Sequence, residues 1–333
     1  MYKSLRISFL ISLATLFIIS GCNSQPGETE APQEAKQYEY AVVIHGGAGF
    51  ATPEKLGPDG EKAYEMAMDS ALNIGLEILK SGGSSIDVVE NVLVYLENNP
   101  MFNAGKGAVY TSEGKVELDA SIMNGADLNA GAITGIERVK NPIKAARAVM
   151  ENSVHVMFSG HGATEFAKTQ DLEIVDQDYF LTEKSRKSLE RALKEDKFGT
   201  VGCVALDQEG NLCAGTSTGG ITNKKHGRVG DVPVIGAGTY AKNGVAGISC
   251  TGQGEFYIRI AAAHEVVSLM DYKGMSVEAA AQNVIFEQLL PFDAKGGIIC
   301  LDLNGNVAME FNTSAMFRAY GNSDGDRIVK IFK

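Results

Sequence analysis

The stretch FGTVGCVALDQEGNL, residues 198–212, carries the pattern from which the architecture can be read. Its apolar run at 201–206 predicts a buried strand, and Gly210-Asn211 is typical of a tight turn into the next strand. A weak repeat of this pattern occurs at 299–307, with Gly305-Asn306 at the turn. The sequence therefore predicts two β-hairpins that flank the second half of the chain.

Helices and further strands are indicated by the spacing of apolar residues. Helices are predicted at residues 61–80, 85–97, 142–151, 162–168, 254–270 and 276–289. Strands are predicted at residues 40–44, 108–111, 116–123, 130–136 and 154–158, with the HGGAG segment at 45–49 ending the first of them. Hairpins with helices between them predict an α/β (α+β) fold in which helices cover two packed sheets, a four-layer αββα sandwich.

The composition limits the classes of partner. The 333 residues are 44% apolar, which is enough for a large buried core. The 41 acidic and 30 basic residues give a net charge of -11, which repels nucleic-acid phosphates and anionic lipid surfaces. Nucleic acid is therefore excluded as a partner, and a membrane contact is expected only through a covalent anchor.

The N-terminus has the features of an export signal. Two basic residues precede the apolar run 7–19, and Ser20-Gly21-Cys22 follows it, as in a bacterial lipobox. We expect residues 1–21 to be a lipoprotein signal peptide, Cys22 to be lipidated and residues 22–38 to be a disordered tether. An ordinary signal peptide is the alternative. The expected location is the bacterial cell envelope, lipid-anchored and facing the periplasm or the surface.

Four further cysteines lie in apolar runs, and free buried thiols are favoured over disulfides for Cys203, Cys213, Cys250 and Cys300.

Thr200 follows a charge-dense segment and precedes an apolar one. If the chain were cut after Gly199, the free α-amine of Thr200 could serve as the base for its own hydroxyl. The charged linker at 182–199 would provide the exposed backbone that a processing site needs. The alternative is that Gly199-Thr200 only opens a strand.

Two downstream segments contain groups that could bind a small molecule. Arg228 and Asp231 could hold the carboxylate and the ammonium of an amino acid, although a plain ion pair on a loop is the alternative. The segment 250–255 ends a predicted strand with a glycine-rich turn, whose N–H groups could form an oxyanion hole. A tight strand-to-helix connection would explain the same residues.

Seven motifs in register resemble a known family. They are HGGAG at 45–49, FNAGKG at 102–107, GTVG at 199–202, TSTGGITNK at 216–224, GRVGD at 227–231, CTGQGE at 250–255 and FNTSAMFR at 311–318. Together they resemble the plant-type L-asparaginases, or isoaspartyl peptidases, of the N-terminal-nucleophile hydrolase class. The resemblance covers residues 40–333.

The resemblance implies a role for each matching residue. The precursor would cut itself between Gly199 and Thr200, leaving an alpha subunit at 39–199 and a beta subunit at 200–333. The residues implied in catalysis are Thr200, Thr218, Thr251, Gly252 and Asn103. The residues implied in substrate binding are Arg228, Val229, Gly230, Asp231, Thr251, Gly252, Gln253 and Gly254.

The resemblance also implies a reaction, an ion and an assembly. Thr200 would attack the side-chain amide of asparagine or of an isoaspartyl dipeptide and release L-aspartate through an acyl-enzyme. No cofactor is expected for catalysis. A structural sodium ion is expected on the backbone carbonyls of Leu96, Glu97, Asn99, Phe102, Ala104 and Lys106. A dimer of cleaved units is also expected.

Three other functions fit parts of the sequence. His226 is typical of the related glycosylasparaginases, and Val232 replaces a small polar residue often present in the peptidases. Gly215-Thr216-Ser217-Thr218-Gly219 fits the G-x-S-x-G motif of an α/β-hydrolase, with Ser217 as nucleophile. An unprocessed amino-acid-binding lipoprotein would keep the Arg228 and Asp231 pair without cutting its chain.

Overall fold

A computed structural model describes residues 37–183, 185–187 and 199–333. Its strands form two sheets, with the bounds β1 (Ala41–Gly49), β2 (Leu118–Asn124), β3 (Ala130–Ile136), β4 (Met157–Ser159), β5 (Val201–Leu206), β6 (Leu212–Thr218), β7 (Thr239–Lys242), β8 (Ala246–Gly252), β9 (Gly296–Asp302), β10 (Val307–Phe311), β11 (Ala315–Asn322) and β12 (Arg327–Phe332). The larger sheet has the order β12-β11-β1-β5-β6-β2-β3-β4, and the smaller has the order β10-β9-β8-β7. Among the strands of the described residues, β3 and β4 pair in parallel and the other neighbouring strands are antiparallel.

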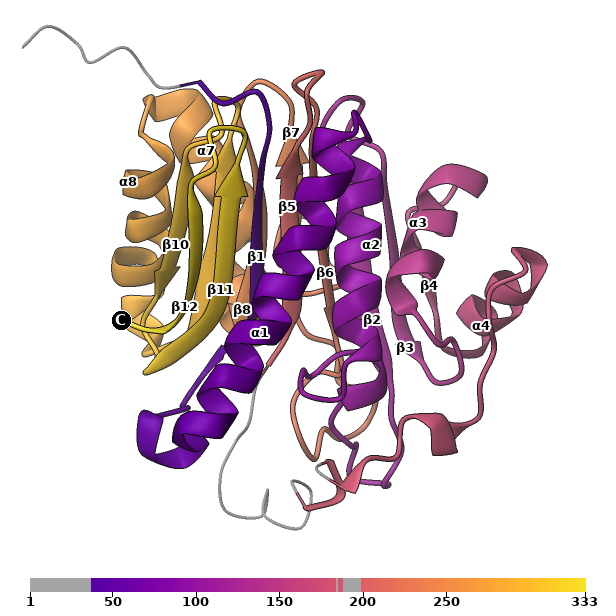
Figure 1. Cartoon of the computed structure of the whole chain (residues 1–333). Coiled ribbons are helices and arrows are strands. Elements are labelled where there is room, and N and C mark those ends of the chain that lie inside the picture. The colour runs from indigo at the N-terminus through magenta and orange to yellow at the C-terminus, as the bar shows by residue number, and fades with distance from the viewer. Residues whose placement is uncertain (1–36, 184, 188–198) are drawn as a thin grey trace, which may run out of the picture. The chain divides into compact units, whose positions relative to one another are not determined.

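Helices cover the outer face of each sheet (Figure 1). Their bounds are α1 (Pro53–Lys80), α2 (Ser85–Asn98), α3 (Pro142–Asn152), α4 (Gly160–Thr169), α6 (Gly254–Ile260), α7 (Ala262–Lys273) and α8 (Val277–Gln282). Helices α1 to α3 pack on the larger sheet, while α7 and α8 pack on the smaller one. The two sheets face each other, so the predicted αββα sandwich is confirmed.

Three apolar clusters fill the spaces between these four layers, and strand alternation divides residues among them. In β1, Val42 and Ile44 point to the helices, whereas Ala41 and Val43 point to the smaller sheet. The third cluster lies between the smaller sheet and its helices. Because both faces of the central strands are buried, their sequences are continuously apolar, which made them readable as strands.

The first strand extends further than predicted. The HGGAG segment was expected to end it after residue 44, but β1 continues to Gly49. Its register against β11 shifts between His45 and Ala48, which marks an irregularity at the two glycines. These glycines interrupt the regular pairing without ending the strand.

The second half contains two helix boundaries that were predicted wrongly. The expected helix 254–270 is divided at Ala261, which has the left-handed φ of 50° and separates α6 from α7. The expected helix 276–289 is α8 followed by a π-helical turn, Asn283–Gln288.

The predicted strand at 108–111 was also wrong. Of these residues, Thr111 alone forms a bridge, an isolated one to Lys224.

Other predictions about the chain are settled in part. Both hairpins are present, as β5 with β6 and β9 with β10, and the four cysteines of the described residues are free and buried. No helix in the described part of the chain is long and apolar enough to cross a bilayer. The predicted signal peptide, Cys22, the tether before residue 37 and most of the charged linker lie outside the described residues.

Candidate active site

Thr200 lies at the start of β5, in the middle of the larger sheet. Its neighbours on either side are β1 and β6, and the residue is 6% exposed. Gly47 of β1 packs directly on it, since a Cβ at Gly47 would lie 3.1 Å from the backbone N and O of Thr200. Gly47 also has a φ of 106°, in the region that favours glycine. The HGGAG segment therefore permits the close approach of β1 to Thr200.

The carbonyl oxygen of Gly199 accepts three hydrogen bonds. The donors are Thr200 Oγ1 at 2.8 Å, Asn103 Nδ2 at 2.8 Å and Thr218 Oγ1 at 3.0 Å. The two threonine hydroxyl oxygens are 3.2 Å apart. One of these donors is the hydroxyl that lies beside the bond between Gly199 and Thr200 and could attack it, and the other two, from Asn103 and Thr218, can stabilise negative charge on the oxygen.

The amide of Asn103 is held in one orientation by its remaining contacts. Its Nδ2 also donates to Gly220 O at 2.7 Å, and its Oδ1 accepts from Val109 N at 2.9 Å. Thr218 ends β6 and accepts from Gly220 N at 2.9 Å. The side chains of Asn103 and Thr218 are therefore both fixed by neighbouring backbone.

The predicted oxyanion turn lies at the end of β8. Thr251 is fully buried, and its Oγ1 accepts from Ala48 N of β1 at 3.2 Å. Gln253 exchanges two hydrogen bonds with the backbone of Lys295, through its own N–H at 3.0 Å and its Oε1 at 2.8 Å. Gly252 pairs with Gly296 of β9. These contacts connect the turn to the same segment of β1 that packs on Thr200.

The predicted pair of Arg228 and Asp231 lies beside this turn, but the two side chains have different surroundings. Arg228 is bound by Glu255, with Nε to Oε1 at 2.8 Å and Nη2 to Oε2 at 2.9 Å. Asp231 is 4% exposed, and a Cβ at Gly254 would lie 2.6 Å from its Oδ1. Among the described residues, Asp231 Oδ2 has no hydrogen-bond partner. The neighbouring Val229 is 41% exposed, whereas Gly230 is buried.

Burial raises the pKa of Asp231 to about 7. Its own backbone N–H and Arg228 oppose this shift, while the negative charges of Glu255 and Asp119 add to it. The ionised form of a buried carboxyl group is unfavourable when no partner compensates for the lost hydration. A cationic ligand that pairs with Asp231 would supply this compensation and so bind favourably.

His45 forms a buried link from β1 to β8. Its Nε2 lies 3.0 Å from Ser249 Oγ, and burial lowers the pKa of the imidazole to about 3, slightly opposed by the Thr200 backbone. Its ring is therefore neutral at physiological pH. Because Nε2 contacts a buried serine and not the Thr200 hydroxyl, the geometry favours a structural role for His45 over that of a base.

The loop predicted to hold a sodium ion brings backbone carbonyls close to two glycines. A Cβ at Gly105 would lie 2.5 Å from Glu97 O, and one at Gly107 would lie 2.0 Å from Phe102 O. Only glycine leaves these carbonyls in place, so the backbone of the loop is closely packed around oxygen donors. Such donors suit sodium, and the carbonyl groups of Glu97 and Phe102 fit the ion.

Ser217, the nucleophile of the α/β-hydrolase alternative, does not lie on an exposed turn. It is fully buried within β6, and its hydroxyl donates to Glu97 Oε1 at 2.7 Å. A nucleophile elbow needs a sharp turn between a strand and a helix, which is absent at this described position. The G-x-S-x-G match is therefore accidental.

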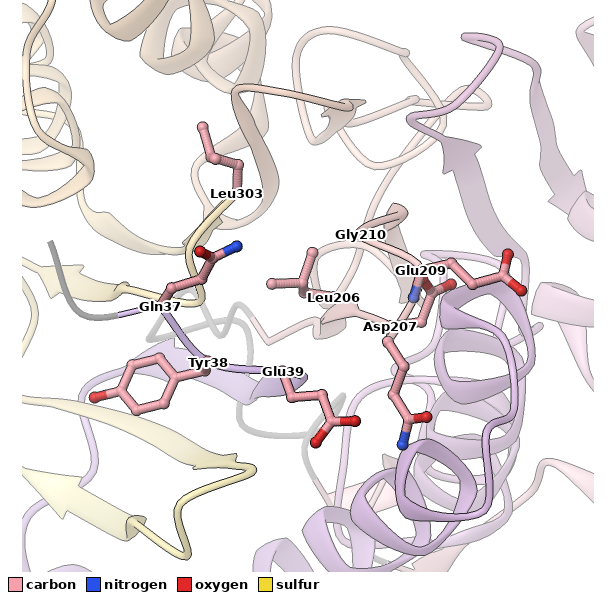
Figure 2. A pocket seen from close by; sticks show the side chains of 9 residues that line it. Gln37, Tyr38, Glu39, Leu206, Asp207, Glu209, Gly210 and Leu303 are labelled. Carbon is pink, nitrogen blue, oxygen red and sulfur yellow. The ribbon is translucent and has the colours of Figure 1, made fainter.

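A hollow at the other end of β5 is not part of this site. It is lined in part by Tyr38, Glu39, Leu206, Asp207 and Leu303 (Figure 2). Leu206 ends the strand that Thr200 precedes, so the length of β5 separates the hollow from the Gly199 carbonyl.

Two residues beside the site were missed by sequence reasoning. Glu255 was quoted only as the last letter of a motif, although an acidic residue near Arg228 could have been read as its partner. Asp119 is 1% exposed and pairs across strands with Thr218, while its Oδ1 accepts from Thr134 Oγ1 at 2.7 Å. Only the three-dimensional pairing of β2 with β6 brings Asp119 here.

The four layers, with a threonine opening a central strand of one inner sheet, are those of the N-terminal-nucleophile hydrolases, a class of amidohydrolases. The model of the asparaginase family matches residues 38–331. The chain belongs to this family.

Curated relatives agree with this assignment. The chain is 44% identical to the isoaspartyl peptidase of Escherichia coli (strain K12), over 84% of this chain and 92% of that protein. It is also 44% identical to the isoaspartyl peptidase of Salmonella typhimurium, over 84% of this chain and 94% of that one. The isoaspartyl peptidase/L-asparaginase of Bos taurus is 39% identical, over 83% of this chain and 91% of that protein. The family resemblance stated from the motifs is confirmed, and the protein is an enzyme.

The raised pKa of Asp231 predicts a pH-dependent effect of Asp231→Asn on stability. Between the ordinary pKa of 3.8 and about 7, the unfolded chain loses the proton that the folded chain keeps. The stability of the wild type should therefore fall relative to that of the variant as pH rises through this window. The unfolding temperature of the variant relative to the wild type should increase by several degrees from pH 4 to pH 8.

Asp176→Asn is the matched control, because Asp176 is exposed and pairs with Arg138 at 2.6 Å. Its effect on the unfolding temperature should be the same at both pH values. A difference between Asp231→Asn and wild type that does not change with pH would contradict the raised pKa.

Proposed function

We propose that this enzyme cuts its own chain between Gly199 and Thr200, and that Thr200 then hydrolyses the side-chain amide of L-asparagine and of isoaspartyl dipeptides. The observation that carries the proposal is the Gly199 carbonyl, whose oxygen accepts hydrogen bonds from Asn103, from Thr218 and from the Thr200 hydroxyl itself. The substrates named for the relatives supply the substrate class.

Self-cleavage would begin with attack of Thr200 Oγ1 on the carbonyl carbon of Gly199. Asn103 and Thr218 donate to the carbonyl oxygen and would stabilise the charge that develops on it. The C–N bond then breaks, the α-amine of Thr200 takes a proton, and the acyl group of Gly199 moves to the hydroxyl oxygen. Water hydrolyses this ester and leaves a carboxylate on Gly199 and a free amine on Thr200.

Substrate hydrolysis would use the same hydroxyl with the new amine as its base. Arg228 would bind the α-carboxylate of the substrate, and the unpartnered oxygen of Asp231 would accept from its α-ammonium. Thr251 and Gly252 would stabilise the oxyanion formed when Thr200 attacks the side-chain carbonyl. Ammonia or an amino acid leaves, and water releases L-aspartate from the acyl-enzyme.

A glycosylasparaginase activity has less support among the described residues. The feature that suggested it, His226, is an exposed residue with a left-handed φ of 55° on the loop before Arg228. It lies outside the buried groups around Gly199. We therefore rank hydrolysis of asparagine and isoaspartyl dipeptides above that of glycosylated asparagine.

Thr200→Ala should give one uncut and inactive chain, because the nucleophile of both reactions is lost. Asn103→Ala should slow self-cleavage by roughly 10²- to 10³-fold, because one donor to the carbonyl is lost. Denaturing gels with intact mass would follow the cut, and release of L-aspartate from L-asparagine, β-Asp-Leu and N4-glycosylated asparagine would rank the substrates.

Thr169→Ala is the matched control for Thr200→Ala, because Thr169 is exposed and its hydroxyl donates only to Phe166 O in the same helix. It should cleave and act like the wild type. Cleavage of Thr200→Ala after Gly199 would sink the proposed role of Thr200, and a wild type that hydrolyses only the glycosylated substrate would reverse the ranking.

We further propose that the backbone carbonyls of Leu96, Glu97, Asn99, Phe102, Ala104 and Lys106 hold a sodium ion. The ion would order the loop that presents Asn103. At constant ionic strength, sodium chloride should raise the unfolding temperature by several degrees over choline chloride. Gly105→Ala should abolish the difference, because its Cβ would lie 2.5 Å from Glu97 O. Equal stability of the wild type in both salts would rule out the site.

We also propose that the enzyme is exported and anchored in the cell envelope through a lipid on Cys22. The wild type should partition into the detergent phase of a cloud-point extraction, and Cys22→Ala should remain in the aqueous phase. Recovery of both proteins from the aqueous phase would contradict the anchor. The dimer of cleaved units stays a prediction, which light scattering of the purified enzyme tests.

A further inference from the structure

Glu255 binds Arg228 through both oxygens of its carboxylate. The Nε–Oε1 and Nη2–Oε2 distances are 2.8 and 2.9 Å, as in a two-bond arginine–carboxylate pair. The Arg228 side chain is 17% exposed and that of Glu255 is 53% exposed. Glu255 lies in the first turn of α6, directly after Gly254, so the ion pair connects the Arg228 loop to this helix.

The contact uses the Nε–Nη2 edge of the guanidinium group, and Nη1 makes no hydrogen bond to any of the described residues. A guanidinium has five N–H donors, and Glu255 occupies one on Nε and one on Nη2. Nη1 lies against glycine backbone, since a Cβ at Gly230 would be 2.8 Å from it and one at Gly220 would be 3.7 Å from it. Because both residues are glycines, neither places a side chain over the Nη1–Nη2 edge. This edge can therefore receive a second carboxylate.

We propose that Glu255 is a positioning residue, which fixes Arg228 so that the Nη1–Nη2 edge binds the α-carboxylate of the substrate. This inference rests on the proposed function, in which Arg228 is the carboxylate receptor. Glu255 itself does not touch the substrate. It selects which edge of Arg228 the substrate meets and reduces the freedom that the long side chain would lose on binding.

The position of α6 supports this role. Gly254 packs on Asp231, whose Oδ1 would be 2.6 Å from a Cβ there. Glu255 therefore holds Arg228 to the same turn of chain that contacts Asp231. The distance between the two proposed receptors for the α-carboxylate and the α-ammonium is thus set by one short segment, residues 254–255.

A competing role would give the opposite result. If Glu255 occupied the place of the substrate carboxylate, its removal would strengthen substrate binding. The Nε edge that it uses is distinct from the terminal Nη1–Nη2 edge, so a positioning role fits the contacts better.

The test compares Glu255→Gln with wild type on two substrates at pH 8.5, where Asp231 is ionised in both proteins. With β-Asp-Leu, KM should rise by about 10-fold and kcat should change less than 2-fold, because part of a charge-assisted contact is lost. The second substrate is the same dipeptide with a carboxamide in place of the α-carboxylate of its aspartyl residue. With this substrate, KM should be the same for both proteins. Glu255→Asp should restore part of the loss.

Asp176→Asn is again the control, since it removes an exposed carboxylate from an arginine far along the chain, and it should leave both KM values unchanged. A lower KM for Glu255→Gln would show competition, and equal increases on both substrates would show a merely structural role. Either result overturns the inference. A wild type that hydrolyses neither β-Asp-Leu nor L-asparagine would instead overturn the proposed function.

Discussion

The convergence of three donors on the Gly199 carbonyl is the constraint around which the rest of the site is arranged. Asn103, Thr200 and Thr218 come from a loop, the start of β5 and the end of β6. Three donors polarise one amide carbonyl only if the backbone that carries it cannot move away. Gly47 of β1 contributes to this condition, because the absence of a side chain there lets the strand pack closely on the backbone of Thr200, 3.1 Å from where a Cβ would lie. The irregular HGGAG segment is therefore part of the site as well as part of the sheet.

A buried row of hydroxyl groups holds the two sheets in register beneath this carbonyl. Ser249 Oγ lies 2.6 Å from Thr216 Oγ1, which in turn accepts from Thr239 Oγ1 at 2.6 Å. Ser121 Oγ donates to Val232 O at 2.5 Å and lies 2.8 Å from Thr239 Oγ1. Apolar faces alone tolerate sliding, whereas a connected polar row is satisfied in one register. The row thereby fixes the loop that begins at Asp231 relative to β6.

The sequence was sufficient for the architecture and for part of the site. Continuous apolar runs and Gly-Asn turns predicted the hairpins, because both faces of the central strands are buried. The same reasoning ended β1 too early at His45, since glycine punctuation cannot be distinguished from an irregular strand by composition. It also missed the break at Ala261, whose left-handed backbone no local residue signals. Asp119 was missed because its place beside Thr218 depends on strand pairing alone.

The two charged groups beside the turn at 250–255 are prepared in opposite ways. Asp231 is buried, and its Oδ2 has no hydrogen-bond partner among the described residues, so its ionised form is unfavourable in the free protein and a bound cation would stabilise it. Arg228 is partly exposed and already paired with Glu255, so its charge is compensated before a ligand binds. The pairing nevertheless fixes the orientation of the guanidinium group. A ligand would then gain most of its binding energy at Asp231 and most of its orientation at Arg228. Discrimination against a ligand group of the wrong charge would be strongest at Asp231, because burial excludes the water that would otherwise screen the interaction.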